Sequence, residues 1–281
     1  MKHDGINIIY EEFGSLAEFV AVIGRRETNK VFEGCSQASY REGYGFTLTD
    51  TYEEATRLAL DGYKEGLDQM MSSGIRITHI ENKPKNMPSV NVVGYVPHVP
   101  NAIAGNPMSM ITTRQNEQKT KVITIVYHMT AHAGTNANNF VVAGKKMLDV
   151  ITTLETQGYR VGLNVMGAYT ESSEWAINGV QVKHWRQPSN PLKISYALIH
   201  PSFFRRHGFR WLETTPELTD RSFQNGYGRT LYDIYYGTSK NRENKLRELG
   251  VLKQNQFYIE YQTAYRLSPN EIIKAMGIGG Q

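Results

Sequence analysis

The expected fold is decided by one stretch, Val122-Ile123-Thr124-Ile125-Val126-Tyr127 followed by His128-Met129-Thr130-Ala131-His132-Ala133-Gly134-Thr135-Asn136. The first six residues form a short apolar run rich in β-branched side chains, which indicates a buried strand. The next nine are mostly small or polar, as in a loop. Open α/β sheets carry their ligand sites at the carboxyl ends of strands. The stretch therefore indicates such a sheet, with residues 128–136 at its carboxyl edge.

A long amphipathic helix is expected after this loop. Its apolar residues recur at steps of three and four and form one stripe that faces a sheet, namely Phe140, Val141, Gly144, Met147, Leu148, Ile151 and Leu154. Gly158 then provides a helix stop, and residues 159–166 have the apolar character of a second strand. A strand, a helix and a strand in this order predict a right-handed parallel crossover.

Strands and helices continue to alternate after residue 166. Strands are expected at residues 180–185, 230–236 and 256–261. Helices are expected at residues 191–211 with an interruption at Pro201, at residues 239–249, and from Ser268 onward. This alternation predicts an α/β fold with an open, mostly parallel, doubly wound sheet.

The first part of the chain is expected to be a smaller segment built around one clear helix. Thr51-Tyr52-Glu53-Glu54 fits a capping box, in which Thr51 and Glu54 satisfy each other's backbone donors. The apolar stripe of this helix reaches Met71 but is interrupted by Gly62 and Gly66. Residues 82–88 are polar and contain two prolines, which breaks regular structure. We therefore expect a mixed helical segment at 1–88, a Pro/Gly-rich connector at 89–119 and the α/β core at 120–281.

Length and composition indicate a globular protein, which we expect in the cytoplasm. The chain has 281 residues, of which 40% are hydrophobic. No stretch approaches the roughly 18 to 20 uninterrupted apolar residues of a membrane span, and the first residues lack a secretory pattern, so we expect no membrane contact. Cys35 is the single cysteine, which excludes an intramolecular disulfide. The formal charge of +4 permits an anionic partner without requiring one.

Residues 121–166 resemble the opening unit of a von Willebrand factor A-like domain, and the resemblance extends over residues 120–281. The first loop of that family often carries a metal-binding Asp-x-Ser-x-Ser motif. In this alignment His128 stands at the Asp position, Thr130 at the first Ser and His132 at the second. The resemblance thus implies a divalent metal site, but this set favours Zn²⁺ or another transition metal over Mg²⁺. We favour the interpretation that both histidines make polar contacts at a strand end, and a metal or anion site is the alternative.

Three further segments look similar to uncharacterised proteins of tailed phages and integrative elements. They are residues 46–55 with 62–66, residues 95–110, and Ile199-His200-Pro201-Ser202-Phe203-Phe204-Arg205-Arg206-His207-Gly208-Phe209. The resemblance spans most of the chain and implies a protein associated with a phage or acting inside its host cell. It implies no activity, since a shared fold does not define a function.

Basic and aromatic residues gather between residues 183 and 211. Arginine and lysine neutralise phosphates, and exposed aromatic rings stack on unpaired bases, so the pattern suits single-stranded nucleic acid. The candidate nucleic-acid or anion-binding residues are Lys183, Arg186, Arg205, Arg206 and Arg210. We favour the interpretation that the aromatic side chains belong to the core and the arginines cap or pair locally, and nucleic-acid binding is the alternative.

The sequence contains no convincing catalytic set. Glu171, Glu174, Glu213 and Asp233 lie near expected element ends, where a carboxylate pair would suit metal-dependent hydrolysis, but their spacing matches no motif. We therefore expect a non-enzymatic interaction or assembly protein without a cofactor, which binds itself or other proteins. Nucleic-acid binding through residues 183–211 is the alternative, and a metal-dependent enzyme is a further one.

Overall fold

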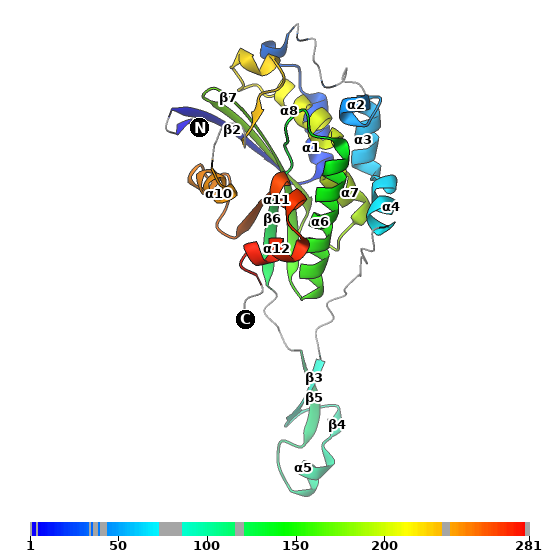
Figure 1. The fold of residues 1–281 in the computed structure, drawn as a ribbon. Helices are drawn as coiled ribbons and strands as arrows, with labels where there is room; N and C mark the ends of the chain where they lie inside the picture. Colours follow the sequence, from blue (N-terminus) through cyan, green and yellow to red (C-terminus); the bar gives the residue numbers. More distant parts are fainter. Residues whose placement is uncertain are drawn as a thin grey trace. The chain divides into compact units, whose positions relative to one another are not determined.

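A computed structural model describes residues 2–3, 5–33, 35, 39, 44–72, 86–115, 121–231 and 237–278 (Figure 1). The chain forms two compact units. Unit 1 comprises Met1–His79 with Val122–Gln281, and unit 2 comprises Ile80–Lys121. The sequence placed the N-terminal segment apart from the core, whereas strand β2 (Ile6–Phe13) lies in the same sheet as the strands after residue 121.

One sheet forms the centre of unit 1, and its main path runs in the order β1-β2-β8-β7-β6-β10. Besides β2, its strands are β1 (Lys2–His3), β6 (Val122–His128), β7 (Arg160–Glu171), β8 (Glu174–Lys183), β9 (Arg229–Thr230) and β10 (Gln256–Glu260). β6 is parallel to both β7 and β10, and β2 is parallel to β8. β7 is antiparallel to β8 and β9, and β1 is antiparallel to β2. The expected α/β fold with a mostly parallel central sheet is confirmed.

The predicted crossover connects β6 to β7 through helix α6 (Ala137–Thr156). Asn136 caps the start of the helix, because its side chain accepts a hydrogen bond from the backbone N–H of Asn138. Gly158 ends this region with a φ of 88°, a left-handed conformation that glycine adopts without strain. The strand and helix predicted in this part of the sequence are therefore present with nearly the expected bounds.

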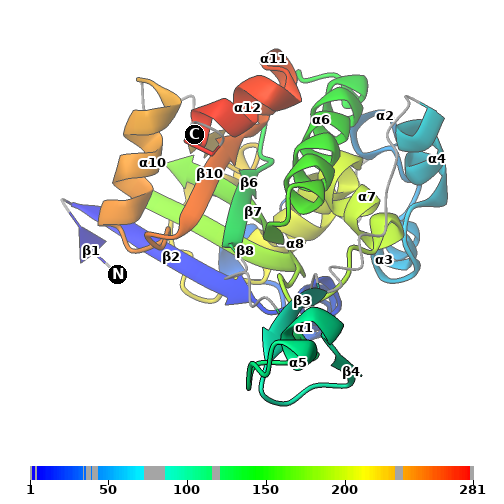
Figure 2. The ribbon, with the colours of Figure 1, turned by 90° about the horizontal axis from the view of Figure 1, so that it is seen from below.

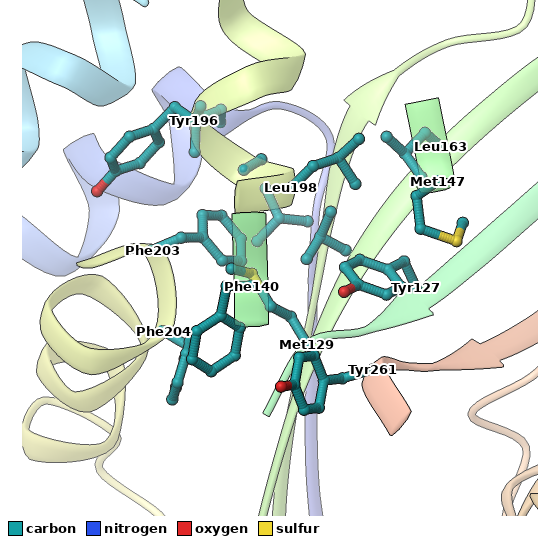
Figure 3. Close-up of a cluster of buried hydrophobic side chains, with 14 of the residues drawn as sticks. Tyr127, Met129, Phe140, Met147, Leu163, Tyr196, Leu198, Phe203, Phe204 and Tyr261 are labelled. Carbon is teal, nitrogen blue, oxygen red and sulfur yellow. The ribbon is translucent and has the colours of Figure 1, made fainter. Parts of the chain in front are cut away.

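Described helices cover both faces of the sheet (Figure 2). One face carries α1 (Leu16–Arg25), α6, α7 (Pro191–Ile199), α11 (Tyr261–Arg266) and α12 (Pro269–Ala275), and the other carries α10 (Ser239–Glu248). Side chains alternate between the faces along β6, so Ile125 and Tyr127 join the larger core while Val126 joins the smaller. Figure 3 shows part of the larger core around Tyr127 and Phe140. No described helix is long and apolar enough to cross a membrane.

Close contact between α6 and α7 depends on a glycine. A Cβ atom at Gly144 would lie 2.2 Å from Cγ2 of Ile199 and 2.6 Å from the backbone oxygen of Leu198. Real Cβ atoms do not approach other atoms this closely, so any larger residue would push the helices apart. The glycine in the apolar stripe of the predicted helix therefore has a packing role.

The N-terminal part differs from the expectation of one clear helix. β2 and α1 precede η1 (Lys30–Phe32) and α2 (Tyr44–Thr47), and the expected helix is two helices, α3 (Tyr52–Asp61) and α4 (Lys64–Ser72). Gly62 separates them with a φ of 102°. The Thr51 side chain accepts a hydrogen bond from the Glu54 N–H, but the Glu54 carboxylate accepts from Asp50 rather than from Thr51. The predicted hydrogen bond from the Thr51 N–H to the Glu54 carboxylate is therefore wrong, whereas the one from the Glu54 N–H to Thr51 is confirmed.

The stretch expected to be helical at residues 191–211 contains three helical segments. They are α7, the π-helical segment η2 (Phe203–Gly208) and α8 (Phe209–Glu213). The short η3 (Arg221–Gln224) and β9 follow. Most of the strand expected at residues 230–236 lies outside the described residues, which resume at Gly237.

Unit 2 is a small antiparallel sheet with one short helix. Its strands are β3 (Asn86–Asn91), β4 (Val96–Pro97) and β5 (Met110–Gln115), in the order β3-β5-β4, and its helix is α5 (Val99–Ile103). The sequence predicted a connector for most of this region. Prolines at positions 97 and 100 fit the structure because one lies in the short β4 and the other in the first turn of α5.

Candidate functional site

A cavity of about 730 Å³ opens next to the carboxyl end of β6. This volume lies within the range of pockets that hold small organic ligands. The loop after β6, the end of β7, the η2 segment and the loop before β9 contribute to its wall. The described residues that line it are Phe46, Thr130, Ala131, His132, Ala133, Tyr169, Phe204, Arg205, Phe209, Gly226, Tyr227, Gly228, Arg229, Thr230, Gly237 and Arg242. The sequence predicted a site at this edge, but not the contributions of residues 169 and 226–230.

Arg205 is a buried cation in the cavity wall, with 2% of its surface exposed. Its guanidinium donates hydrogen bonds to the backbone oxygens of Phe46 at 2.7 Å and Thr135 at 3.1 Å. The charge also lies 4.1 Å from the ring centre of Phe46, a favourable cation–π distance. Burial lowers the pKa of Arg205 to about 10, which leaves the side chain charged at neutral pH.

No carboxylate of the described residues balances the charge of Arg205. Within the described part of the chain, Arg205 forms no ion pair, and its Nε atom is buried without a hydrogen-bond partner. Arg229 is exposed where it lines the cavity, and its guanidinium forms no hydrogen bond or ion pair with described residues. Among the described residues that line the cavity there is no aspartate or glutamate. The cavity wall therefore has an excess of positive charge.

A third arginine at the cavity, Arg242, is neutralised by Glu260 at the end of β10. The two side chains form a bidentate ion pair, with one N–O distance of 2.7 Å, and both are almost fully buried. Burial alone raises the pKa of Glu260, but the hydrogen bonds from Arg242 outweigh this effect and leave that pKa below its usual value. A bidentate geometry of this kind is the strongest form of the arginine–carboxylate contact.

His128 connects to this ion pair through Tyr258. Nδ1 of His128 lies 2.7 Å from the Tyr258 hydroxyl, which donates to Glu260 at 3.1 Å. Burial lowers the pKa of His128 to about 4, so the ring is neutral at neutral pH. Nε2 is buried without a partner among the described residues.

The three residues of the predicted metal site occupy different environments. His128 is buried and bound to Tyr258, and the Thr130 hydroxyl accepts a hydrogen bond from the Ala168 N–H at 2.9 Å. His132 is exposed, and its Nδ1 accepts from the Gly134 N–H. In the part of the chain that the structure describes, no group of three or more His, Cys, Asp or Glu side chains is placed to hold a metal ion.

Most of the predicted nucleic-acid or anion-binding residues are engaged inside unit 1. Lys183 is buried and pairs with Glu155 at 2.8 Å, and Arg206 is buried with hydrogen bonds to the backbone oxygens of residues 39 and 49. Arg210 pairs with Glu213 at 3.5 Å. Arg186 is exposed and lies over the Trp185 ring, and Arg205 lines the cavity. In this arrangement the five residues do not form one exposed basic surface.

Two of the four carboxylates considered for hydrolysis hold loops in place. Glu174 accepts hydrogen bonds from the backbone N–H groups of Thr219 and Asp220, and Glu213 accepts from the Tyr227 hydroxyl at 2.7 Å. Asp233 lies outside the described residues. Local hydrogen bonding thus explains Glu174 and Glu213, and the third described carboxylate, Glu171, is half-buried at the end of β7 opposite Glu174.

The loop before β9 carries an unusual backbone at the cavity wall. Gly226, Tyr227 and Gly228 have successive φ angles of 109°, 63° and 78°. Tyr227 is not a glycine, so its left-handed conformation is strained and is held by neighbouring contacts. Its ring stacks on Phe209 with centroids 4.0 Å apart. The glycines on either side of Tyr227 were a sequence signal for this loop, but the sequence analysis did not use that signal.

A second candidate site is the exposed apolar surface of unit 2. The structure describes the side chains of residues 88–112 there, and none of these residues is buried. Large apolar side chains are exposed instead, and these are Val92, Val93, Tyr95, Val96, Val99, Ile103 and Met108. We call these seven residues the unit 2 apolar set. Val93 is 78% exposed and Ile103 is 82% exposed, which is unusual for side chains of this size.

These features define unit 1 as an α/β protein with a ligand-sized cavity at the carboxyl edge of a mostly parallel sheet. Residues 2–276 match the model of the family described as Domain of unknown function (DUF7192), and the chain belongs to that family. No curated protein and no solved structure matches the chain.

Proposed function

We propose that this protein is a non-enzymatic interaction protein that assembles with itself or with another protein through unit 2. The unit 2 apolar set is the observation that supports this proposal. Several large apolar side chains exposed on one small folded unit are typical of an interaction site, because their burial against a partner releases water.

The size of unit 2 strengthens the argument. A three-stranded sheet needs a covered apolar face for independent stability. Residues 88–112 contain three strand segments and one short helix, yet no residue among them is buried. A partner that covers the apolar set would supply the missing core. Association would therefore stabilise unit 2 through the same surface that recognises the partner.

The arrangement of the apolar set suits a docking surface. Val99 and Ile103 are four residues apart on α5, so they lie on the same side of the helix. Val96 lies in β4, which pairs with β5 at Ile111. The apolar residues are thus carried by hydrogen-bonded elements rather than by a structureless connector.

The origin and setting of the protein are further parts of the proposal. The β6–α6–β7 crossover supports a relationship to von Willebrand factor A-like domains, which was expected from residues 121–166. We also propose a setting in a tailed phage or an integrative element, either in a particle or in the cytoplasm of a host cell. The proposal requires neither a metal ion nor another cofactor for assembly.

The experiment compares two double variants. Val93→Ser with Ile103→Ser removes two of the most exposed members of the apolar set, and Leu60→Ser with Val142→Ser removes two exposed apolar residues of unit 1 as the matched control. Sedimentation velocity over a range of concentrations measures self-association, and pull-down from the native context detects another protein. We expect association to be lost in the unit 2 variant and retained in the control.

Two results would contradict the proposal. One is a wild-type protein that stays monomeric and captures no protein partner from its native context. The other is an equal loss of association in both double variants, because the effect would then come from general surface polarity rather than from unit 2.

A further inference from the structure

We propose that the cavity of unit 1 binds a small organic anion, in which a carboxylate or phosphate group is carried on an apolar body. This site lies entirely within unit 1 and is independent of the assembly proposed for unit 2. Arg205 and Arg229 provide the positive charge, and aromatic side chains provide the surface for the apolar body.

The charge of the wall favours an anion over a neutral ligand. Arg205 is 2% exposed and has no carboxylate partner among the described residues. A buried charge without a counter-ion is costly, because protein interior solvates it less well than water. The rings of Phe46 and Phe204, at 4.1 and 5.2 Å, reduce this cost but carry no net charge. An anion in the adjacent cavity would supply the missing negative charge.

Arg229 is exposed and adds a second positive charge to the cavity wall, beside the buried charge of Arg205. It belongs to β9 and lines the same cavity, and its guanidinium donors are not used by described residues. Arginine binds carboxylate and phosphate groups through two parallel N–H donors. The exposed Arg229 therefore suits direct contact with the anionic group, while Arg205 acts from the wall as a fixed charge.

The size and lining of the cavity favour an organic ligand over an inorganic ion. A volume of about 730 Å³ exceeds the space that one phosphate ion needs. Among the described residues that line it are the aromatic side chains of Phe46, Tyr169, Phe204, Phe209 and Tyr227. Burial of an apolar body against these rings would add binding free energy that inorganic phosphate cannot gain.

The strained loop at residues 226–228 is consistent with a ligand site. Left-handed residues outside glycine cost of order 1–3 kcal/mol and gather at binding sites, where neighbouring contacts hold them. Tyr227 is held by the Phe209 ring and by the Glu213 carboxylate. This anchoring fixes the loop that leads directly into Arg229.

Isothermal titration calorimetry at low ionic strength tests the proposal on the full chain. Benzoate and phenyl phosphate carry the two candidate anionic groups on the same apolar body, inorganic phosphate lacks the body, and benzyl alcohol lacks the charge. We expect benzoate or phenyl phosphate to bind at least tenfold more tightly than benzyl alcohol and inorganic phosphate. The preferred probe decides between carboxylate and phosphate, and its affinity should fall as salt increases.

A pair of variants locates the binding site. Arg229→Gln should weaken the preferred probe at least tenfold, whereas Arg221→Gln, an exposed arginine of η3 that does not line the cavity, should leave its affinity unchanged. Arg205→Gln should also weaken binding. Because Arg205 donates hydrogen bonds to backbone oxygens, circular dichroism must show that this variant is folded. Absence of binding by both organic anions, equal binding of benzyl alcohol, or equal losses in Arg229→Gln and Arg221→Gln would overturn the proposal.

Discussion

Unit 1 buries most of its large apolar side chains, whereas unit 2 leaves large apolar side chains exposed. Unit 1 covers both faces of its sheet with helices and buries aromatic residues such as Phe140 and Trp211 completely. Unit 2 has no buried residue between positions 88 and 112, and it exposes Val93 and Ile103. The difference indicates that unit 1 carries its own folding free energy, whereas the apolar surface of unit 2 is suited to burial against a partner.

Acid should produce the largest effect on unit 1. Burial lowers the folded-state pKa of His128 and His200 to about 4 and that of His207 to about 3, against about 6.5 in an unfolded chain. The unfolded state then binds more protons between these values, so stability is present above pH 6.5 and is lost as pH falls toward 4. Each histidine contributes on the order of 3 kcal/mol to this loss.

Circular dichroism during acid titration measures this effect. In denaturant unfolding at several pH values, His128→Gln should reduce the slope of unfolding free energy against pH by up to about 1.4 kcal/mol per pH unit between pH 6.5 and 4. The exposed His132→Gln variant is the control. A wild-type protein that keeps its full structure and stability at pH 3.5 would rule out buried neutral histidines.

Loss of the buried ion pair should have the next largest effect. Glu260→Gln leaves Arg242 buried beside an uncharged amide, and breaking such a pair costs about 3–5 kcal/mol. The matched control is Glu248→Gln, because the Glu248 side chain is 58% exposed and its pair with Lys245 should contribute less than about 1 kcal/mol. Urea unfolding of both variants measures the difference. Equal stability losses would show that the pair at the sheet edge is not desolvated.

Gly144→Ala should have a smaller effect on the same unit. The added methyl group would clash with Ile199 and Leu198 of α7, and overpacking of this kind costs about 1–3 kcal/mol. Gly24→Ala is the control, because α1 has open space at that position and alanine favours a helix. Thermal unfolding should show a lower midpoint for the first variant and an unchanged or higher midpoint for the second. A tolerated Gly144→Ala would mean that α6 and α7 pack less closely than described.

The smallest expected effect concerns unit 2. Val93→Ser with Ile103→Ser removes exposed side chains that make no core, so the unfolding free energy of unit 1 should change by less than about 0.5 kcal/mol. Tryptophan fluorescence follows unit 1 alone, because all three tryptophans of the chain lie there, at positions 175, 185 and 211. A loss of more than about 1 kcal/mol would mean that the apolar set stabilises unit 1 directly.

Local sequence patterns predicted the part of unit 1 that depends on local contacts. The strand at residues 122–127, the helix with its stripe from Phe140 to Leu154 and the stop at Gly158 follow from periodicity and capping. The position of β2 was not predictable in this way. It pairs with β8, more than 160 residues further along the chain, and such pairing leaves no local signal.

The candidate site was predicted only in part for the same reason. The loop after β6 was expected at the carboxyl edge, but its partners Arg205, Tyr227 and Arg229 come from distant segments. A basic stretch also does not reveal which side chains are buried, so the sequence could not separate the exposed Arg186 from the buried Arg206. In unit 2, proline and glycine content suggested a connector, although the strands pair across it.

Hydrogen exchange of residues 88–112 tests the contrast between the units most directly. The measurement compares dilute protein with protein at concentrations, or with a captured partner, that give assembly. We predict rapid exchange of unit 2 amides in the monomer and at least tenfold slower exchange on assembly, while the amides of β6 and α6 remain protected in both. Unit 2 amides that are already as protected in the monomer as those of β6 would contradict the account, because unit 2 would then be stable without a partner.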